Sequence, residues 1–145
     1  MNKPPYLLAA FLCEKVLTEQ DGVTSAIRIF DRVFVPYLEK EDPPKSAVAL
    51  TLLLMFKSGG FKGKATVTIS LFAPSGAKRP DTTQEVTFPE QVNGGANIVG
   101  NIAFSPKEEG LYWFEILLNG ESVTRIPLDV QVLPSLPVTE QLPKP

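Results

Sequence analysis

The chain has 145 residues, of which 43% are hydrophobic and 21% charged, and its formal net charge is −2. These values are ordinary for one soluble globular domain, and they give no electrostatic attraction to nucleic acid or to anionic lipid. The sequence contains no histidine, which excludes Ser-His-Asp and Cys-His catalysis and histidine-containing metal sites, and its single cysteine cannot form an internal disulfide.

The first predicted element is a β-strand over residues 6–17, which contains the only cysteine, Cys13. Its apolar run is far shorter than the about 20 residues that a membrane helix needs. A signal segment and a helix are the alternatives, but the bulky Phe11 and Leu12 argue against lipoprotein-type processing at the cysteine. The turn residues 20–22 end the pattern. We expect a strand that is buried on both faces over most of its length. A strand that is part of the fold cannot be cleaved away as a signal segment, so we also expect a cytoplasmic protein with no membrane attachment.

The second element, residues 24–35, alternates apolar and polar side chains in the manner of a strand with two different faces. One face carries Ile27, Ile29, Val33 and Val35, and the opposite face carries Arg28, Phe30, Arg32 and Phe34. Asp31 lies on the apolar face, where a carboxylate needs a partner, so a β-bulge that turns it outward is expected.

Four further strands are predicted in the middle of the chain, at residues 47–56, 65–73, 82–88 and 97–104. The first is apolar on both faces, as in a central strand, and the second alternates cleanly. The third is short and polar, which is typical of an edge strand. In the fourth, Gly100 marks a bulge or a close crossing.

The last predicted element is a hairpin, in which two apolar runs are joined by Asn119-Gly120. This dipeptide tolerates a positive φ at both turn positions and so favours a tight two-residue turn. Pro127 on the return strand has no N–H to donate, which places that strand at an edge or directs this position away from a partner.

About eight strands and no segment of helical period predict an all-β protein, a single antiparallel β-sandwich over residues 1–133. Residues 134–145 contain four prolines and are expected to form an extended C-terminal tail.

The segment EEGLYWF, residues 108–114, resembles the corner before strand F of immunoglobulin-like domains. Glu108, Gly110 and Tyr112 match its alternating acidic, small and tyrosine positions. The resemblance implies an Ig-like sandwich in which the Tyr112 hydroxyl bonds to nearby backbone. Phe114 stands where antibody domains carry a disulfide cysteine, so the likeness is to the broad Ig-like class.

A second resemblance covers more of the chain. The apolar strand that ends in Cys13-Glu14, the segment DGVTSAIRIFDRV and the closing GLYWFEILLNGESVTRIPLDV look like a family of small uncharacterised bacterial proteins. This resemblance implies a cytoplasmic, non-secreted β-sandwich, and it implies no functional residues.

The candidate binding residues are aromatic and charged side chains on outward strand faces. Trp113 shares the outward face of its strand with Glu115 and Leu117, and an exposed indole is a favourable anchor for a ligand or a partner. The alternative is that a neighbouring strand, a loop or the tail covers it. The stripe of Arg28, Phe30, Arg32 and Phe34 is a second candidate, and the alternative there is a solvated face with local cation–π packing.

No catalytic constellation, metal site or cofactor motif is present in the sequence. We therefore expect a non-catalytic protein that acts through protein–protein contact, by self-association or as a subunit of a larger assembly. The alternative hypothesis is a carbohydrate-binding or small-ligand-binding module built around Trp113.

Overall fold

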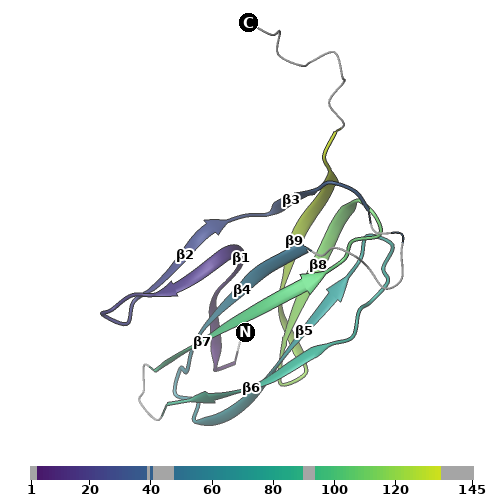
Figure 1. Ribbon diagram of the computed structural model, residues 1–145. Coiled ribbons are helices and arrows are strands. Elements are labelled where there is room, and N and C mark those ends of the chain that lie inside the picture. The colour runs from purple at the N-terminus through teal and green to yellow at the C-terminus, as the bar shows by residue number, and fades with distance from the viewer. Residues whose placement is uncertain (1–2, 39, 41–47, 90–93, 135–145) are drawn as a thin grey trace, which may run out of the picture.

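Nine strands form two sheets in the computed structural model, which describes residues 3–38, 40, 48–89 and 94–134 (Figure 1). Their bounds are β1 Tyr6–Thr18, β2 Thr24–Ile29, β3 Arg32–Val35, β4 Val48–Lys57, β5 Gly63–Phe72, β6 Thr82–Phe88, β7 Gly95–Phe104, β8 Gly110–Leu118 and β9 Glu121–Val132. None of the described residues belongs to a helix that is long and apolar enough to cross a membrane. The predicted tail lies, from residue 135 on, outside the described residues.

The two sheets differ in size and in strand direction. One has four strands in the order β2-β1-β4-β7, and the other has five in the order β3-β9-β8-β5-β6. All described strand pairs are antiparallel except β3 and β9, which run parallel. The all-β prediction is confirmed, but the prediction of a single, wholly antiparallel sandwich of about eight strands is wrong in direction and in number.

The cause of both differences is a change of sheet within residues 24–35. The backbone of Arg28 has a φ of 55°, which distorts the end of β2. The chain then crosses to the other sheet as β3. Asp31 is exposed in this crossing, and its carbonyl accepts a hydrogen bond of 2.9 Å from the N–H of Asp129 on β9. The expected outward turn of Asp31 is therefore confirmed, although a change of sheet produces it.

The change of sheet also divides the face that the sequence predicted to be shared. Val35 is buried and Val33 is half-buried against the core, whereas Ile27 and Ile29 are exposed on the four-stranded sheet. Phe30, which alternation predicts on the outward stripe, packs against the core instead. Alternation is read along one continuous strand, and it fails where the strand is broken.

The core lies between the inner faces of the two sheets. Phe104 on β7 packs against Tyr112 and Phe114 on β8, with ring centroids 5.3 and 6.4 Å apart, and so joins one sheet to the other. β4 is buried on both faces along most of its length, as predicted. β1 is a strand, as predicted, but its burial is less than expected, since only Leu12 and Cys13 are fully buried.

The β8–β9 hairpin confirms the turn that the sequence predicts. Asn119 and Gly120 both have a positive φ, 49° and 84°, as a two-residue turn of this kind requires. Asn119 also donates its N–H to the Thr66 carbonyl at 2.8 Å and accepts the Thr66 N–H on its side-chain oxygen at 2.9 Å. Pro127 precedes Asp129, where the pairing of β9 with β3 begins, so its missing N–H leaves no gap in the ladder between these two strands.

Gly120 provides a test of this turn. Gly120→Ala should lower the free energy of unfolding by about 1 kcal/mol, because an alanine at positive φ is strained. A β-carbon at Gly120 meets no atom within 4 Å, so the cost comes from the backbone alone. Urea denaturation measures the change.

Gly100→Ala is the matched control. Its β-carbon also meets nothing within 4 Å, and the pairing of β7 with β4 runs without a shift through Gly100, so neither the bulge nor the close crossing predicted there is present. This variant should be neutral or slightly stabilising. Equal losses in both variants would contradict the assigned turn.

Candidate functional site

Five of the seven predicted binding residues lie on the outer face of the five-stranded sheet. They are Trp113, Glu115 and Leu117 on β8, and Arg32 and Phe34 on β3, with β9 running between the two strands. The other two lie apart, because Arg28 belongs to the four-stranded sheet and pairs with Glu14 at 3.2 Å, and Phe30 packs against the core.

Trp113 is half-buried and its ring has close neighbours. The Arg125 guanidinium lies 4.9 Å from the ring centroid and also pairs with Glu115 at 3.7 Å. Across the sheet, Phe72 and Pro127 are the register partners of Trp113. The indole is therefore one part of a packed row, with a cation already over one of its faces.

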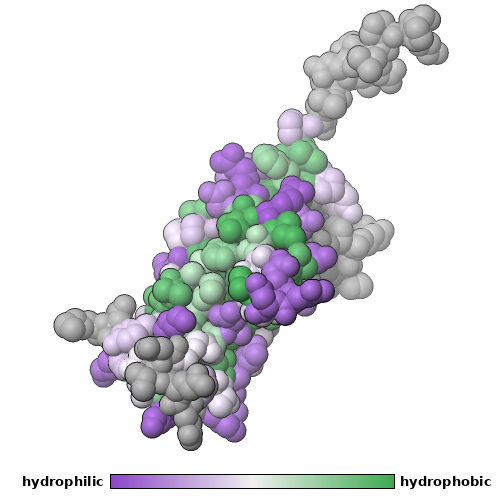
Figure 2. Space-filling view, turned by 90° about the vertical axis from the view of Figure 1, so that its left-hand side faces the viewer, coloured by the Kyte–Doolittle hydropathy of each residue, from purple (hydrophilic) through white to green (hydrophobic). Residues whose placement is uncertain are grey.

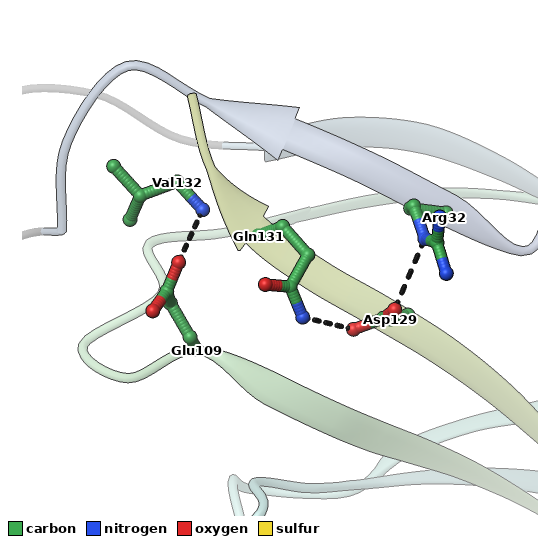
Figure 3. A network of polar contacts seen from close by, with 5 residues as sticks. All are labelled: Arg32, Glu109, Asp129, Gln131 and Val132. Carbon is green, nitrogen blue, oxygen red and sulfur yellow. Dashed lines mark hydrogen bonds and ion pairs between the residues drawn. The ribbon is translucent and has the colours of Figure 1, made fainter. Parts of the chain in front are cut away.

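Arg32 is likewise engaged in local contacts, which Figure 3 shows from close by. Its Nε lies 3.0 Å from Oδ2 of Asp129, whose Oδ1 accepts a hydrogen bond of 2.6 Å from the Gln131 amide. On the same strand, the Val132 N–H donates to Glu109 at 2.6 Å. These bonds fasten β9 to β3 and to the residue before β8, so the polar groups of this part of the face are engaged by one ion pair and two hydrogen bonds of the protein itself.

The outer face of the four-stranded sheet has a different character, because several of its large apolar side chains are exposed. In register across the sheet lie rows such as Phe11–Leu53–Val99. We call this surface the apolar face, and its members are Leu8, Ala9, Phe11, Ile27, Ile29, Leu53, Met55 and Val99. Leu53 on β4 is itself only 2% exposed, so the exposed members lie on the strands around it. Leu8 and Ile29 are 60% exposed and Val99 is 49% exposed. Figure 2, which looks at the side where β2 and β1 lie in Figure 1, shows a band of apolar residues between polar ones.

The charges on the apolar face are of one sign. Lys15 and Lys57 project from it and are exposed, and neither forms an ion pair with another described residue. The carboxylate nearest in sequence, that of Glu14, is already paired with Arg28. Cys13 belongs to the same face by register, opposite Ile29, but it is fully buried, and this burial raises the pKa of its thiol. The thiol is therefore poorly suited to nucleophilic chemistry.

A third feature is a pocket of about 640 Å³ at one end of the molecule, between the β5–β6 loop and the β7–β8 loop. Phe104 and Tyr112 contribute apolar surface to it, and Lys78, Arg79 and Lys107 contribute positive charge. The Tyr112 hydroxyl donates a hydrogen bond of 2.9 Å to the Glu108 carbonyl, which confirms the corner bond that the Ig-like resemblance implies.

The sequence interpretation missed this pocket, although a signal for it exists. The segments PSGAKRPD, residues 74–81, and SPKEEG, residues 105–110, each carry basic residues beside a strand end. Because β5 and β8 pair antiparallel, the end of β5 and the start of β8 come to the same end of the sheet. Within the described part of the chain, no three histidine, cysteine, aspartate or glutamate side chains are grouped so that they could hold a metal ion.

A model described as "Family of unknown function (DUF6941)" matches residues 8–131 of the chain. No curated protein matches. Among solved structures, the chain is similar to the alkylpurine DNA glycosylase AlkC of Pseudomonas fluorescens bound to DNA with an abasic site analogue, at 9% identity and a TM-score of 0.40. It is also similar to an immunoglobulin-like protein from Pseudomonas aeruginosa, at 9% identity and a TM-score of 0.36.

The extent of these likenesses limits what they say. The two matches cover 84% and 83% of this chain. They cover 30% of the glycosylase chain and 91% of the immunoglobulin-like protein. Both TM-scores are below 0.5, so neither likeness bears on what this chain binds. The family match agrees with the expected resemblance to a family of uncharacterised proteins.

Proposed function

We propose that this chain, which belongs to the DUF6941 family, is a non-catalytic binding protein. Its apolar face docks on another protein. The observation that carries this proposal is the exposure of Leu8, Ile29 and Val99 on one continuous sheet face. Contiguous exposed apolar surface is unusual on a monomeric soluble protein and commonly marks an interaction site.

The charge of the face supports a partner that differs from this chain. Lys15 and Lys57 are unpaired within the described residues, so a partner with an apolar centre and carboxylates at its rim would complement the face. A second copy docked through the same face would bring the same two unpaired lysines to the contact. Like charges across an interface disfavour such a contact.

The strand edge offers less support for self-association than the face does. β2 is an edge strand of its sheet, but Arg28 interrupts it with a positive φ and carries an exposed charge. Both features are ways in which natural sheets avoid edge-to-edge pairing. The apolar face, and not the β2 edge, is therefore the proposed contact.

The non-catalytic part of the proposal rests on the side chains present. The chain has no histidine, and its one thiol is buried with a raised pKa. The alternative of a carbohydrate or small-ligand module around Trp113 has weaker support, since Arg125 lies over the ring and Glu115 is paired with Arg125. We also propose that the two sheets form an Ig-like arrangement, which the Tyr112 corner bond supports.

Quantitative affinity purification from the native host, followed by binding measurements with the recovered partner, tests the proposal. Ile29→Asp should weaken partner binding by about tenfold or more, because it replaces one of the most exposed apolar side chains of the face with a carboxylate. Lys15→Glu should weaken it less and reduce its salt dependence.

Thr87→Asp is the matched control, since it adds the same exposed carboxylate to the edge strand of the other sheet. Binding should be unaffected by it. Light scattering should report a monomer. A dimer that Ile29→Asp dissociates would replace the distinct partner with a second copy, and a partner retained equally by all variants would refute docking on this face.

A further inference from the structure

The pocket at the loop end of the molecule carries features of a ligand site, and these are independent of the apolar face. Its volume of about 640 Å³ falls in the range of pockets that hold small molecules. The wall combines apolar surface from three alanines, in front of the buried Phe104 and Tyr112, with positively charged side chains from two loops. Such a mixture of apolar surface and a few converging polar groups is typical of small-ligand sites.

Arg79 is the distinctive residue of this pocket. The chain has four arginines, all of them described, and three of these pair with a carboxylate within 3.7 Å. Arg79 instead donates one hydrogen bond of 2.8 Å to the Ser105 carbonyl, and its guanidinium lies 5.5 Å from the centroid of the Phe104 ring. It has no carboxylate partner among the described residues.

The hydrogen bond to the Ser105 carbonyl and the contact with the Phe104 ring together hold the Arg79 side chain in place. The hydrogen bond uses one N–H of the five that a guanidinium offers. The side chain is half-buried at the pocket wall, so little conformational freedom remains to be lost when a ligand binds. A held guanidinium with free donors is suited to a two-pronged contact with a carboxylate or a phosphate.

The other charges of the wall strengthen this preference. Lys107 is exposed on the facing loop and forms no ion pair with a described residue, whereas Lys78 is paired with Asp81 at 3.2 Å. The one carboxylate in the wall is that of Glu108, and it already accepts the Ser75 N–H at 3.0 Å. Arg79 and Lys107 thus line the pocket with no ion pair to a described residue, against one carboxylate, on a chain whose net charge is −2.

We propose that this pocket binds a small organic anion, with a phosphate or carboxylate group on Arg79 and Lys107 and a small apolar body against Ala73, Ala77 and Ala103. The anionic group accepts hydrogen bonds from the free N–H groups of Arg79, and the apolar body packs against the small apolar side chains of the wall. The site goes beyond the proposed docking function and does not depend on it.

The test uses phenyl phosphate as the probe in an NMR titration of isotope-labelled protein. We expect saturable shifts of the backbone amides in residues 73–79 and 105–109, the two loops that line the pocket. Benzoate should shift the same amides, and the tighter of the two probes identifies the preferred anionic group. Benzyl alcohol, which has the ring without the charge, should produce no saturable shift at the same concentrations.

Three variants separate recognition at this site from nonspecific attraction. Arg79→Gln should raise the Kd of phenyl phosphate by about tenfold or more, since a charge-assisted, two-pronged contact is lost. Lys107→Gln should raise it by about threefold, as expected for an exposed charge. Lys62→Gln removes an exposed lysine at the opposite end of β5 and should leave the Kd unchanged.

The variants also make the proposal refutable. Circular dichroism establishes that each variant folds, and if Arg79→Gln does not fold, Lys107→Gln carries the comparison because its side chain is exposed and unpaired among the described residues. Equal losses with Lys62→Gln and Lys107→Gln, shifts that do not saturate, or benzyl alcohol binding as tightly as phenyl phosphate would each overturn the proposed site.

Discussion

Phe104→Ala should lower the free energy of unfolding by about 3–5 kcal/mol, the usual cost of removing a buried phenylalanine. Phe104 is 3% exposed and belongs to β7 of the four-stranded sheet, yet its ring partners are Tyr112 and Phe114 of the five-stranded sheet. The substitution therefore removes contacts between the two layers. The cavity would lie between sheets that are held apart by other core side chains, so it closes only in part.

Val99→Ala is the matched control for this prediction. Val99 lies on the same strand but on the outer face, 49% exposed, and its loss should cost less than about 1 kcal/mol. Urea denaturation of both variants measures the difference, provided that the dependence on urea stays unchanged. Similar losses for the two variants would contradict the assignment of inner and outer faces of β7.

The parts of the fold that could be predicted from the sequence are those where local chemistry and tertiary packing agree. Residues 82–88 form β6 with the predicted bounds, at the sheet edge that their polarity indicates. The Asn119-Gly120 turn is set by backbone preferences that act within two residues. Alternation along β5 is also retained, because that strand has one inner and one outer face throughout.

The errors arise where one strand serves two environments. Residues 24–35 carry a single alternating pattern, but the chain changes sheet near Asp31, so Ile29 faces outward while Val33 faces the core. Likewise β1 pairs with β4 through its first half and with β2 through its second half. The apolar residues of β1 predict burial on both faces, because an exposed apolar face has the same sequence pattern as a buried one.

The candidate sites follow the same logic. Trp113 could be placed on an outward face by alternation, but the Arg125 contact over its ring depends on cross-strand register, which the sequence does not specify. The pocket is harder still, because Arg79 and Lys107 come from loops that only the pairing of distant strands brings together. Each loop shows its basic residues beside a strand end, but the sequence does not specify that the two loops converge.

Tyr112→Phe should lower the free energy of unfolding by about 1–2 kcal/mol. The ring is 1% exposed and its hydroxyl donates to the Glu108 carbonyl at 2.9 Å, so the variant keeps the packing but leaves a carbonyl without its partner. Tyr37→Phe is the control, because Tyr37 is 51% exposed, and it should change stability by less than about 0.5 kcal/mol. An unchanged free energy of unfolding in Tyr112→Phe would show that the corner bond does not stabilise the fold.

The same variant has a pH signature whose sign is fixed by the burial of the ring. Burial raises the pKa of the Tyr112 hydroxyl above its ordinary value of 10.0, although the hydrogen bond to Glu108 works in the opposite direction. Above that pH the unfolded chain releases the proton and the folded chain retains it, so the contribution of Tyr112 is complete below pH 10 and is lost as the pH rises through the folded-state pKa. The difference in stability between the natural chain and Tyr112→Phe should therefore shrink above pH 10, which urea denaturation at a series of alkaline pH values measures. Lysine deprotonation affects both proteins alike, so a difference that stays constant across this range would show that the hydroxyl has an ordinary pKa and is not held in a buried corner.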